Sequence, residues 1–174
     1  MKALILTGKY AQDIEVFYPL YRMQEEGWEV DIVMPDREAL GVYGMKIVGA
    51  RPLAEIQMFN FWQVLILPGG ARAMEYLRTN NLVIEAIQKC FENGAVIGSI
   101  CHGAQLLISA GLVKGRTISG YYSIKDDIVN AGGTWPGSYV DVDPPFVTDG
   151  RIVTSPHYKY LGPWMREVIR VALS

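Results

Sequence analysis

The sequence predicts an α/β fold of the doubly wound type, in which a mostly parallel sheet lies between two layers of helices. Short apolar runs, typical of buried strands, alternate along the chain with stretches of helical periodicity. One apolar run, 95–100, ends at Cys101 and continues through His102 and Gly103 into an apolar helical pattern. A reactive side chain on such a sharp strand-to-helix turn indicates a nucleophile elbow.

Length and composition agree with one domain over residues 1–174. Half of the residues are apolar and the net charge is −2, so the chain gives no reason to expect nucleic-acid or membrane partners. The apolar runs are too short to cross a bilayer, and no signal-peptide pattern precedes the first strand. The two cysteines, Cys90 and Cys101, do not form a disulfide framework, so we expect a reducing, cytoplasmic location.

The first half of the chain is expected to contain three strands and three helices. Gly27 closes the first helix, Pro19 predicts a kink or tight turn within it, and Pro35 ends the second strand. We expect strands over 2–6, 28–34 and 62–67, a small antiparallel excursion over 41–49, and helices over 14–24, 72–78 and 82–93.

The second half continues the alternation after the elbow strand at 95–100. An Asp149-Gly150 turn between two apolar runs indicates a β-hairpin over 146–154. We also expect a short strand over 117–119, a helix over 124–130, a strand around Val140 and Val142, and an amphipathic helix over 161–173.

Ligands bind open α/β sheets at the carboxyl ends of the strands, where the loops 7–13, 68–72 and 101–103 are expected to meet near Tyr121 and Tyr122. The elbow places the Cys101 thiol near the N-terminal end of a helix, which favours the thiolate. The alternative is that Cys101 is a small buried hydrophobic residue, as many single cysteines are.

Other residues around the elbow have both a catalytic and a structural interpretation. Gly69 and Gly70 can aim N–H groups at an oxyanion together with the N–H of His102, or can form a tight turn only. His102 can move protons or cap the helix, and His157 either reaches the pocket or lies in a surface loop. Two histidines and two cysteines without metal-ligand spacing predict no metal site, and no cofactor is expected.

With these residues the chain resembles the ThiJ/PfpI superfamily, specifically the PfpI-type intracellular proteases. The resemblance covers nearly the whole chain and rests on these stretches: Asp13 to Glu15, Leu67 to Gly70, Ser99 to Gly103, Gly115-Arg116 and Ile124 to Asp127. It implies a flavodoxin-like three-layer α/β/α sandwich, related to class I glutamine amidotransferases, with a nucleophilic cysteine. Members of the superfamily include proteases, glutathione-independent glyoxalases, deglycases, isonitrile hydratases and stress chaperones.

The resemblance also implies a catalytic triad of Cys101, His102 and a glutamate supplied by a neighbouring subunit. The matching carboxylate is Glu75, at the family's spacing before the cysteine, so a homo-oligomer, a dimer or hexamer, is expected. Without the resemblance, the sequence favours an exposed helix residue with a surface pair at Glu75. Gly103 completes the Cys-His-Gly motif and is expected beside the substrate.

Two departures from the family pattern concern the pocket. The family usually places a glutamate that touches the nucleophile after the first strand, and we match that position to Gln12, which cannot act as a general acid or base. Glu15, one helical turn further on, is an alternative acid, but it matches a separate family glutamate and is as consistent with a side chain that faces elsewhere. Where a proline often follows the residue matching Tyr121, this chain has Tyr122; both tyrosines could edge the pocket, although aromatic residues are more often core.

These expectations describe a cysteine-dependent enzyme acting on a small carbonyl compound, a glycated adduct, or an amide or peptide bond. Cys101 would attack the electrophilic carbon, with Gly70 and His102 N–H groups holding the oxyanion. Two alternatives remain open. One is a redox sensor or chaperone-like stress protein with an oxidisable Cys101, and the other is a specialised hydratase or lyase on the same scaffold.

Overall fold

The computed structural model describes residues 1–36, 38–48, 51–55, 62–137 and 145–174. Within these residues, most strands belong to one sheet and two form a separate antiparallel ribbon. The sheet contains β1 (Lys2–Leu6), β2 (Glu29–Met34), β5 (Arg51–Pro52), β6 (Val64–Leu67), β7 (Val96–Ile100), β8 (Val147–Asp149) and β9 (Ile152–Ser155). The ribbon contains β3 (Ala39–Leu40) and β4 (Lys46–Ile47).

The seven-stranded sheet has the order β5-β2-β1-β6-β7-β9-β8, and only β8 is antiparallel to its neighbour. Its central part, β2-β1-β6-β7-β9, has the strand order of a flavodoxin-like fold, which confirms the predicted fold class. The chain reverses its direction of winding between β1 and β6. The loop after β1 and the turn after β6 therefore face each other at the carboxyl edge of the sheet, beside the end of β7.

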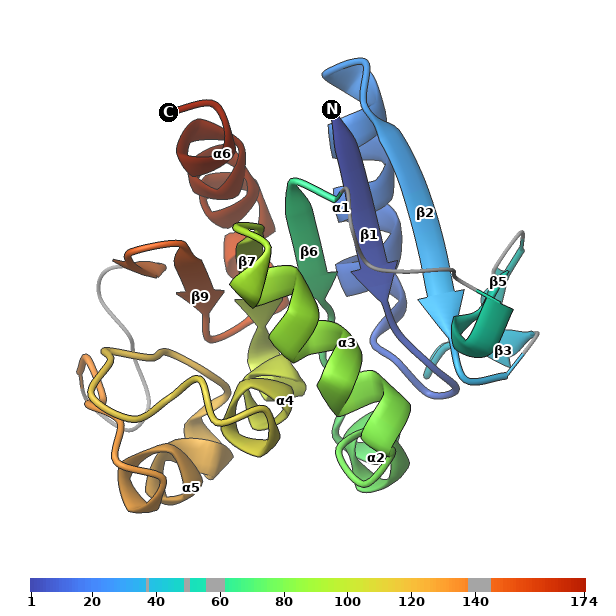
Figure 1. Ribbon diagram of the computed structural model, residues 1–174. Helices are drawn as coiled ribbons and strands as arrows, with labels where there is room; N and C mark the ends of the chain where they lie inside the picture. Colours follow the sequence, from blue (N-terminus) through green and yellow to red (C-terminus); the bar gives the residue numbers. More distant parts are fainter. Residues whose placement is uncertain (37, 49–50, 56–61, 138–144) are drawn as a thin grey trace.

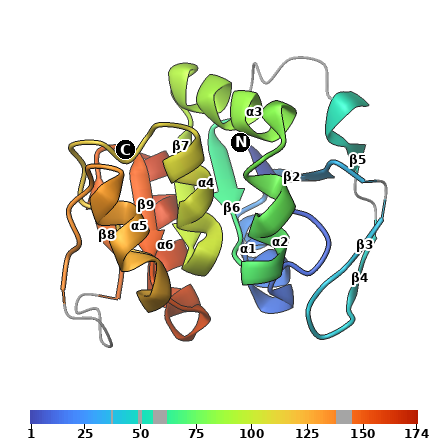
Figure 2. The same cartoon turned by 90° about the horizontal axis from the view of Figure 1, so that it is seen from below.

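Helices cover both faces of the sheet, as Figures 1 and 2 show. One face is covered by α1 (Asp13–Glu25) and α6 (Leu161–Ala172), which pack against each other. The other is covered by α2 (Ala71–Leu77), α3 (Asn81–Glu92) and α4 (Ala104–Ser109), with α5 (Lys125–Asn130) beyond α4. Short 3-10 turns occupy Leu53–Glu55, Cys101–Gly103, Tyr122–Ile124 and Tyr158–Tyr160.

The core is built on the central strands, because every residue of β6 and β7 is buried. The largest fully buried side chain is that of Trp164 in α6, whose indole Nε1 donates a hydrogen bond to the carbonyl oxygen of Val153 at 3.1 Å. A Cβ atom on Gly98 would lie 2.9 Å from Ile66 and 3.1 Å from Trp164. Gly98 is thus the position in β7 that lets α6 approach the sheet closely.

Most predicted elements are confirmed, and the exceptions have a local cause. The predicted strand over 117–119 is wrong: Thr117 makes a single bridge to Thr134. Side chains take the place of a strand partner there, because the Thr117 N–H donates to Asp149 and the Ser119 N–H donates to the hydroxyl of Thr154. The strand predicted around residues 140 and 142 lies outside the described residues, and α1 continues through Pro19 without a break.

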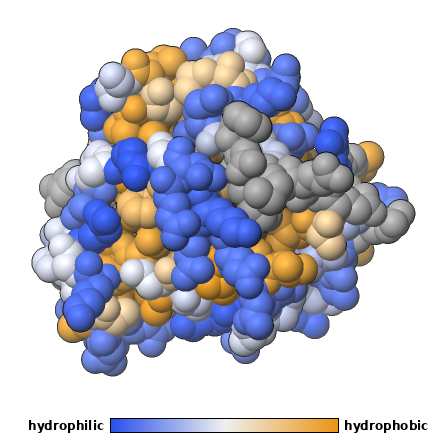
Figure 3. All heavy atoms as spheres, in the orientation of Figure 1, coloured by the Kyte–Doolittle hydropathy of each residue, from blue (hydrophilic) through white to orange (hydrophobic). Residues whose placement is uncertain are grey.

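The face shown in Figure 3 carries polar groups interspersed with smaller apolar patches. Among the helices that the structure describes, none combines the length and apolar character needed to cross a membrane.

We predict that Trp164→Ala lowers the free energy of unfolding by about 3–5 kcal/mol, because it removes a fully buried side chain and leaves a cavity. Urea denaturation measures the change. The matched control is Leu173→Ala, close to the same helix but 63% exposed, which should change stability by less than about 0.5 kcal/mol. Equal effects of the two substitutions would contradict the packing described for α6.

Candidate active site

The elbow after β7 is a strained turn that holds Cys101 at the carboxyl edge of the sheet. Cys101 has φ of 59°, a left-handed conformation that few non-glycine residues adopt, and its side chain is 7% exposed. Two residues later, a Cβ atom on Gly103 would lie 2.3 Å from the carbonyl oxygen of Leu67. Gly103 therefore serves the close packing of the elbow on β6, and the strain at Cys101 is typical of functional sites.

The Gly69-Gly70 turn after β6 lies directly against this elbow. A Cβ atom on Gly69 would be 2.8 Å from the His102 nitrogen and 2.9 Å from the Cys101 Cβ, so only glycine fits. Gly70 has φ of 108°. The backbone N–H groups of Gly70 and His102 face the sulfur of Cys101 closely enough to lower the pKa of its thiol. These two N–H groups are the donors available to an oxyanion formed there, as the sequence predicts for this turn.

The N–H of Gly69 has another partner and is not free for a substrate. It donates a 2.7 Å hydrogen bond to Oε2 of Glu15, a fully buried carboxyl group in the first turn of α1. In return the N–H of Gln12 donates to the carbonyl oxygen of Gly69 at 3.1 Å. The segment after β1 and the turn after β6 therefore each donate a hydrogen bond to the other.

Glu15, and not residue 12, places a carboxyl group against the nucleophile. No nitrogen or oxygen donor among the described residues reaches Oε1 of Glu15, and the carboxyl group interacts with the thiol of Cys101. The match of the nucleophile-contacting glutamate to Gln12 is therefore wrong. Gln12 precedes the first residue of α1 and lines the pocket, whereas Glu15 lies one turn further on and points under the elbow.

Burial raises the pKa of Glu15 to about 7, against the opposing effect of its hydrogen bonds with Gly69 and Cys101. Burial also raises the pKa of the Cys101 thiol, and a charged Glu15 raises it further, while the N–H groups of His102 and Gly70 oppose this. Two buried negative charges cannot lie side by side at low cost. A thiolate at Cys101 is therefore disfavoured while Glu15 is ionised, and the thiol pKa is raised where the position near a helix end was expected to favour the thiolate.

His102 lies between the sulfur and a hydroxyl group of the same chain. Its Nδ1 is 3.4 Å from Cys101 Sγ, and its Nε2 is 3.4 Å from Ser123 Oγ. Burial lowers the pKa of His102, which favours the neutral ring near pH 7. With its proton on Nε2, the ring donates to Ser123 and leaves the Nδ1 lone pair facing the sulfur. Sequence reasoning missed Ser123 because a single serine in a turn carries no periodic or motif signal.

Aromatic rings form one wall of the pocket. The Tyr121 ring stacks on His102 with 4.7 Å between centroids, and the His157 ring lies 6.0 Å from Tyr121. His157 accepts a hydrogen bond at Nδ1 from the Lys159 N–H, so its neutral ring carries a proton on Nε2. The resulting cysteine pocket has a volume of about 440 Å³ and is lined by Gln12, Val42, Tyr43, Gly70, Ala71, Arg72, Cys101, His102, Tyr121, His157 and Tyr158.

Glu75 is exposed on α2 and does not line the cysteine pocket of its own chain. A second chain would have to bring it to a site, and its catalytic role stays a prediction. Cys90 and Cys101 are both free thiols. Within the part of the chain that the structure describes, no cluster of three or more His, Cys, Asp or Glu side chains could hold a metal ion.

The fold and elbow define a class, the flavodoxin-like α/β proteins with a cysteine on a strand-to-helix turn, and comparison with known proteins agrees. The model of the DJ-1/PfpI family matches residues 1–171. "Deglycase TK1284" of Thermococcus kodakarensis is 40% identical over 98% of this chain and 99% of its own length. "Deglycase PfpI" of Pyrococcus furiosus is 38% identical over the same shares. The chain therefore belongs to the DJ-1/PfpI family.

Other relatives carry other names. "Putative cysteine protease YraA" of Bacillus subtilis is 31% identical over 84% of this chain and 86% of its own length. Among solved structures, Schizosaccharomyces pombe DJ-1 has a TM-score of 0.85 at 19% identity, covering 98% of this chain and 90% of that one. That structure supports the fold alone.

The buried carboxyl group gives a prediction for stability against pH. Folding raises the pKa of Glu15 from 4.5 to about 7, so between these values the folded chain binds more protons than the unfolded one. The contribution of Glu15 to stability must then fall as pH rises from about 4.5 to about 7, by up to about 3 kcal/mol. Chemical denaturation at several pH values should show this decline in the wild type and a smaller one in Glu15→Gln. Identical pH profiles would contradict a protonated Glu15.

The contact between His102 and Ser123 gives a second prediction. Ser123→Ala should reduce reaction rates at Cys101 by about tenfold, because the ring loses the partner that fixes its tautomer, whereas Ser123→Thr should retain most of the rate. Nitrogen NMR of labelled histidine distinguishes the tautomers directly. An unchanged Nε2–H tautomer and rate in Ser123→Ala would exclude a positioning role.

Proposed function

We propose that this protein is a cysteine-dependent enzyme of the deglycase and glyoxalase type, acting on small carbonyl compounds or on their adducts with thiols and amines. The observation that carries the proposal is the placement of a buried acid, Glu15, against the sulfur of Cys101, with His102 on another side of it. This arrangement offers a nucleophile together with two groups that exchange protons near neutral pH.

The proposed reaction starts with attack of the Cys101 thiolate on the aldehyde carbon of a 2-oxoaldehyde. The carbonyl electron pair moves to oxygen, where the N–H groups of Gly70 and His102 stabilise it, and a proton from Glu15 completes a hemithioacetal. The proton on that carbon then moves to the neighbouring carbonyl carbon and the hydroxyl proton moves to the neighbouring oxygen, which gives the thioester of a 2-hydroxy acid. Water then cleaves the thioester, releasing a 2-hydroxy acid and the thiol. In sum, methylglyoxal and water give lactate and a proton.

An adduct follows the same course after one additional step. The sulfur of Cys101 forms a bond to the carbon that carries the adduct's thiol or amine. The bond from that carbon to the original sulfur or nitrogen breaks, and the thiol or amine leaves with a proton. Because Glu15 supplies the acid, the glutamine at position 12 does not remove proton transfer on carbon. Gln12 instead lies in the pocket wall, where its amide can contact the substrate.

The pocket supports a small substrate over a polypeptide. Its volume is about 440 Å³, and the rings of Tyr121, His157 and Tyr158 narrow one side of it. Cleavage of amide or peptide bonds by Cys101 and His102 is the second candidate, supported by the relative named a putative cysteine protease. Two free, buried thiols also support our proposal of a reducing, cytoplasmic location.

The activity is tested by incubating the protein with methylglyoxal in the absence of glutathione and measuring lactate. We expect the wild type to release lactate, Cys101→Ser to release none, and Glu15→Gln to lose at least about a hundredfold in rate. Cys90→Ala is the matched control, since it removes the other buried thiol and should keep the activity. Unchanged lactate release in Cys101→Ser would exclude the proposed nucleophile. No release by any form, with Cys101 oxidised at low peroxide, would favour the redox-sensor alternative.

We further propose that Glu75 acts on the site of a neighbouring chain in a homo-oligomer, a dimer or hexamer. Cys101→Ser and Glu75→Gln, each inactive alone, should complement each other when mixed after dissociation and reassembly. Random pairing in a two-fold dimer restores roughly a quarter of wild-type activity, because half of the dimers are mixed and each contains one intact site. No recovery, or full activity of Glu75→Gln alone, would show that Glu75 is not part of a shared site.

A further inference from the structure

Besides Cys101, one non-glycine residue among those described has a positive φ, and it lies on the other side of the cysteine pocket. Tyr10 has φ of 62°, a left-handed conformation that is strained for a bulky residue. Its N–H donates to the carbonyl oxygen of Leu40 at 2.7 Å. Its own carbonyl oxygen lies 2.6 Å from where a Cβ on Gly70 would be. The strained Tyr10 backbone is thus fixed against the candidate oxyanion turn.

The Tyr10 ring supports the guanidinium group of Arg72. The Arg72 Cζ lies 3.6 Å from the centre of the ring, so the cation rests on the aromatic face. Arg72 belongs to the first turn of α2 and lines the cysteine pocket with Cys101. Stacking uses the face of a guanidinium group and leaves the N–H groups at its edge for a planar anion. Among the described residues, none forms an ion pair with Arg72, including Glu75 on the next turn.

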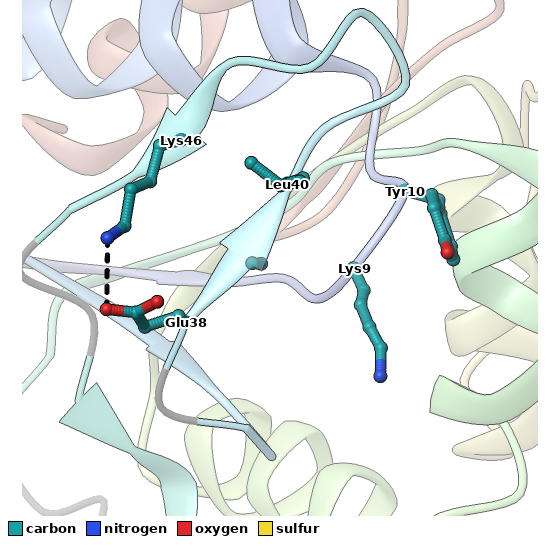
Figure 4. A pocket seen from close by; sticks show the side chains of 6 residues that line it. Lys9, Tyr10, Glu38, Leu40 and Lys46 are labelled. Atoms are coloured by element: carbon teal, nitrogen blue, oxygen red, sulfur yellow. Dashed lines mark ion pairs between the residues drawn. The ribbon is translucent and has the colours of Figure 1, made fainter.

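A neighbouring pocket also contains cations, but these differ from Arg72 because each has an acidic partner. This pocket is lined by Lys9, Tyr10, Glu38, Ala39, Leu40 and Lys46 (Figure 4). Both of its lysines already have a carboxylate partner. Lys46 is paired with Glu38 at 3.0 Å, and Lys9 lies 3.9 Å from Asp36.

The other described residues that line the cysteine pocket agree with an anionic ligand. None of them is an aspartate or glutamate. The side chain of Gln12 lines the same pocket and adds an uncharged polar group to it. The pocket therefore combines the reactive sulfur with a cation that has no ion-pair partner among the described residues.

We propose that the cysteine pocket selects carbonyl adducts that carry a carboxylate, as adducts of free amino acids do. Arg72, held by Tyr10, binds the carboxylate through two N–H groups, and the carbonyl-derived carbon lies at Cys101. This inference rests on the proposed function and names the substrate class of the same site.

The test compares two substrates of nearly equal size that differ in one charge. They are the hemithioacetals that methylglyoxal forms with N-acetylcysteine and with N-acetylcysteine amide. For the wild type we expect kcat/KM at least about tenfold higher for the carboxylate substrate. Arg72→Gln should bring the ratio close to one, and Arg72→Lys should retain part of it because the charge remains. The control Lys9→Gln removes a cation outside the pocket and should leave the ratio unchanged.

A second measurement keeps the proposal testable if neither hemithioacetal is turned over. Binding of N-acetylalanine and of N-acetylalanine amide to Cys101→Ser is followed by calorimetry, with and without Arg72→Gln. The account predicts tighter binding of the acid, lost with Arg72. Equal binding of acid and amide, or a preference that survives Arg72→Gln, overturns the carboxylate subsite. Absence of turnover with the predicted binding would instead reject the proposed function and keep the subsite.

Discussion

The contact between Glu15 and Cys101 is the interaction on which the rest of the site depends. It requires a carboxyl group with no exposed surface, a hydrogen bond from the N–H of Gly69, and a glycine at 69 so that the elbow can approach. The parallel order of β1, β6 and β7 brings these three loops to one edge. Fold and chemistry are thereby linked, because only adjacent strands can deliver the acid, the turn and the nucleophile to one point.

At this edge of the sheet, backbone packing fixes the residues around the reactive sulfur, whereas side chains at the pocket rim contact the substrate and can be exchanged. Cys101, Gly69 and Gly70 are fixed by backbone packing within a few ångströms of one another. The substrate-facing rim of the pocket is made of side chains, namely Arg72 stacked on the Tyr10 ring and the aromatic wall that contains Tyr121. Relatives that share the elbow could thus differ in substrate by exchanging rim residues, which agrees with the different names found within one family.

The sequence predicts the elbow, the glycine turn and the order of most elements, because each depends on local patterning that strand and helix periods reveal. It left Glu15 as an alternative to residue 12, since a buried carboxylate and an exposed one look alike on an amphipathic helix, and only the α1 orientation separates residue 15 from residue 12. Ser123 was missed because it joins the site through a tertiary contact from a turn distant in sequence, and residue 72 was placed in the expected loop 68–72 without a role for its side chain. The strand expected over 117–119 failed because side-chain acceptors outcompeted a strand partner.

The most direct test of this account is the protonation state of Glu15, measured by infrared difference spectroscopy of its carboxyl group across the neutral pH range. The account predicts the band of a buried, protonated carboxyl group that persists at about pH 6, disappears as pH passes about 7, and is missing in Glu15→Gln. A carboxyl band that is already lost below about pH 5 would show that Glu15 is an ordinary ionised glutamate. The acid proposed beside Cys101 would then not exist at neutral pH.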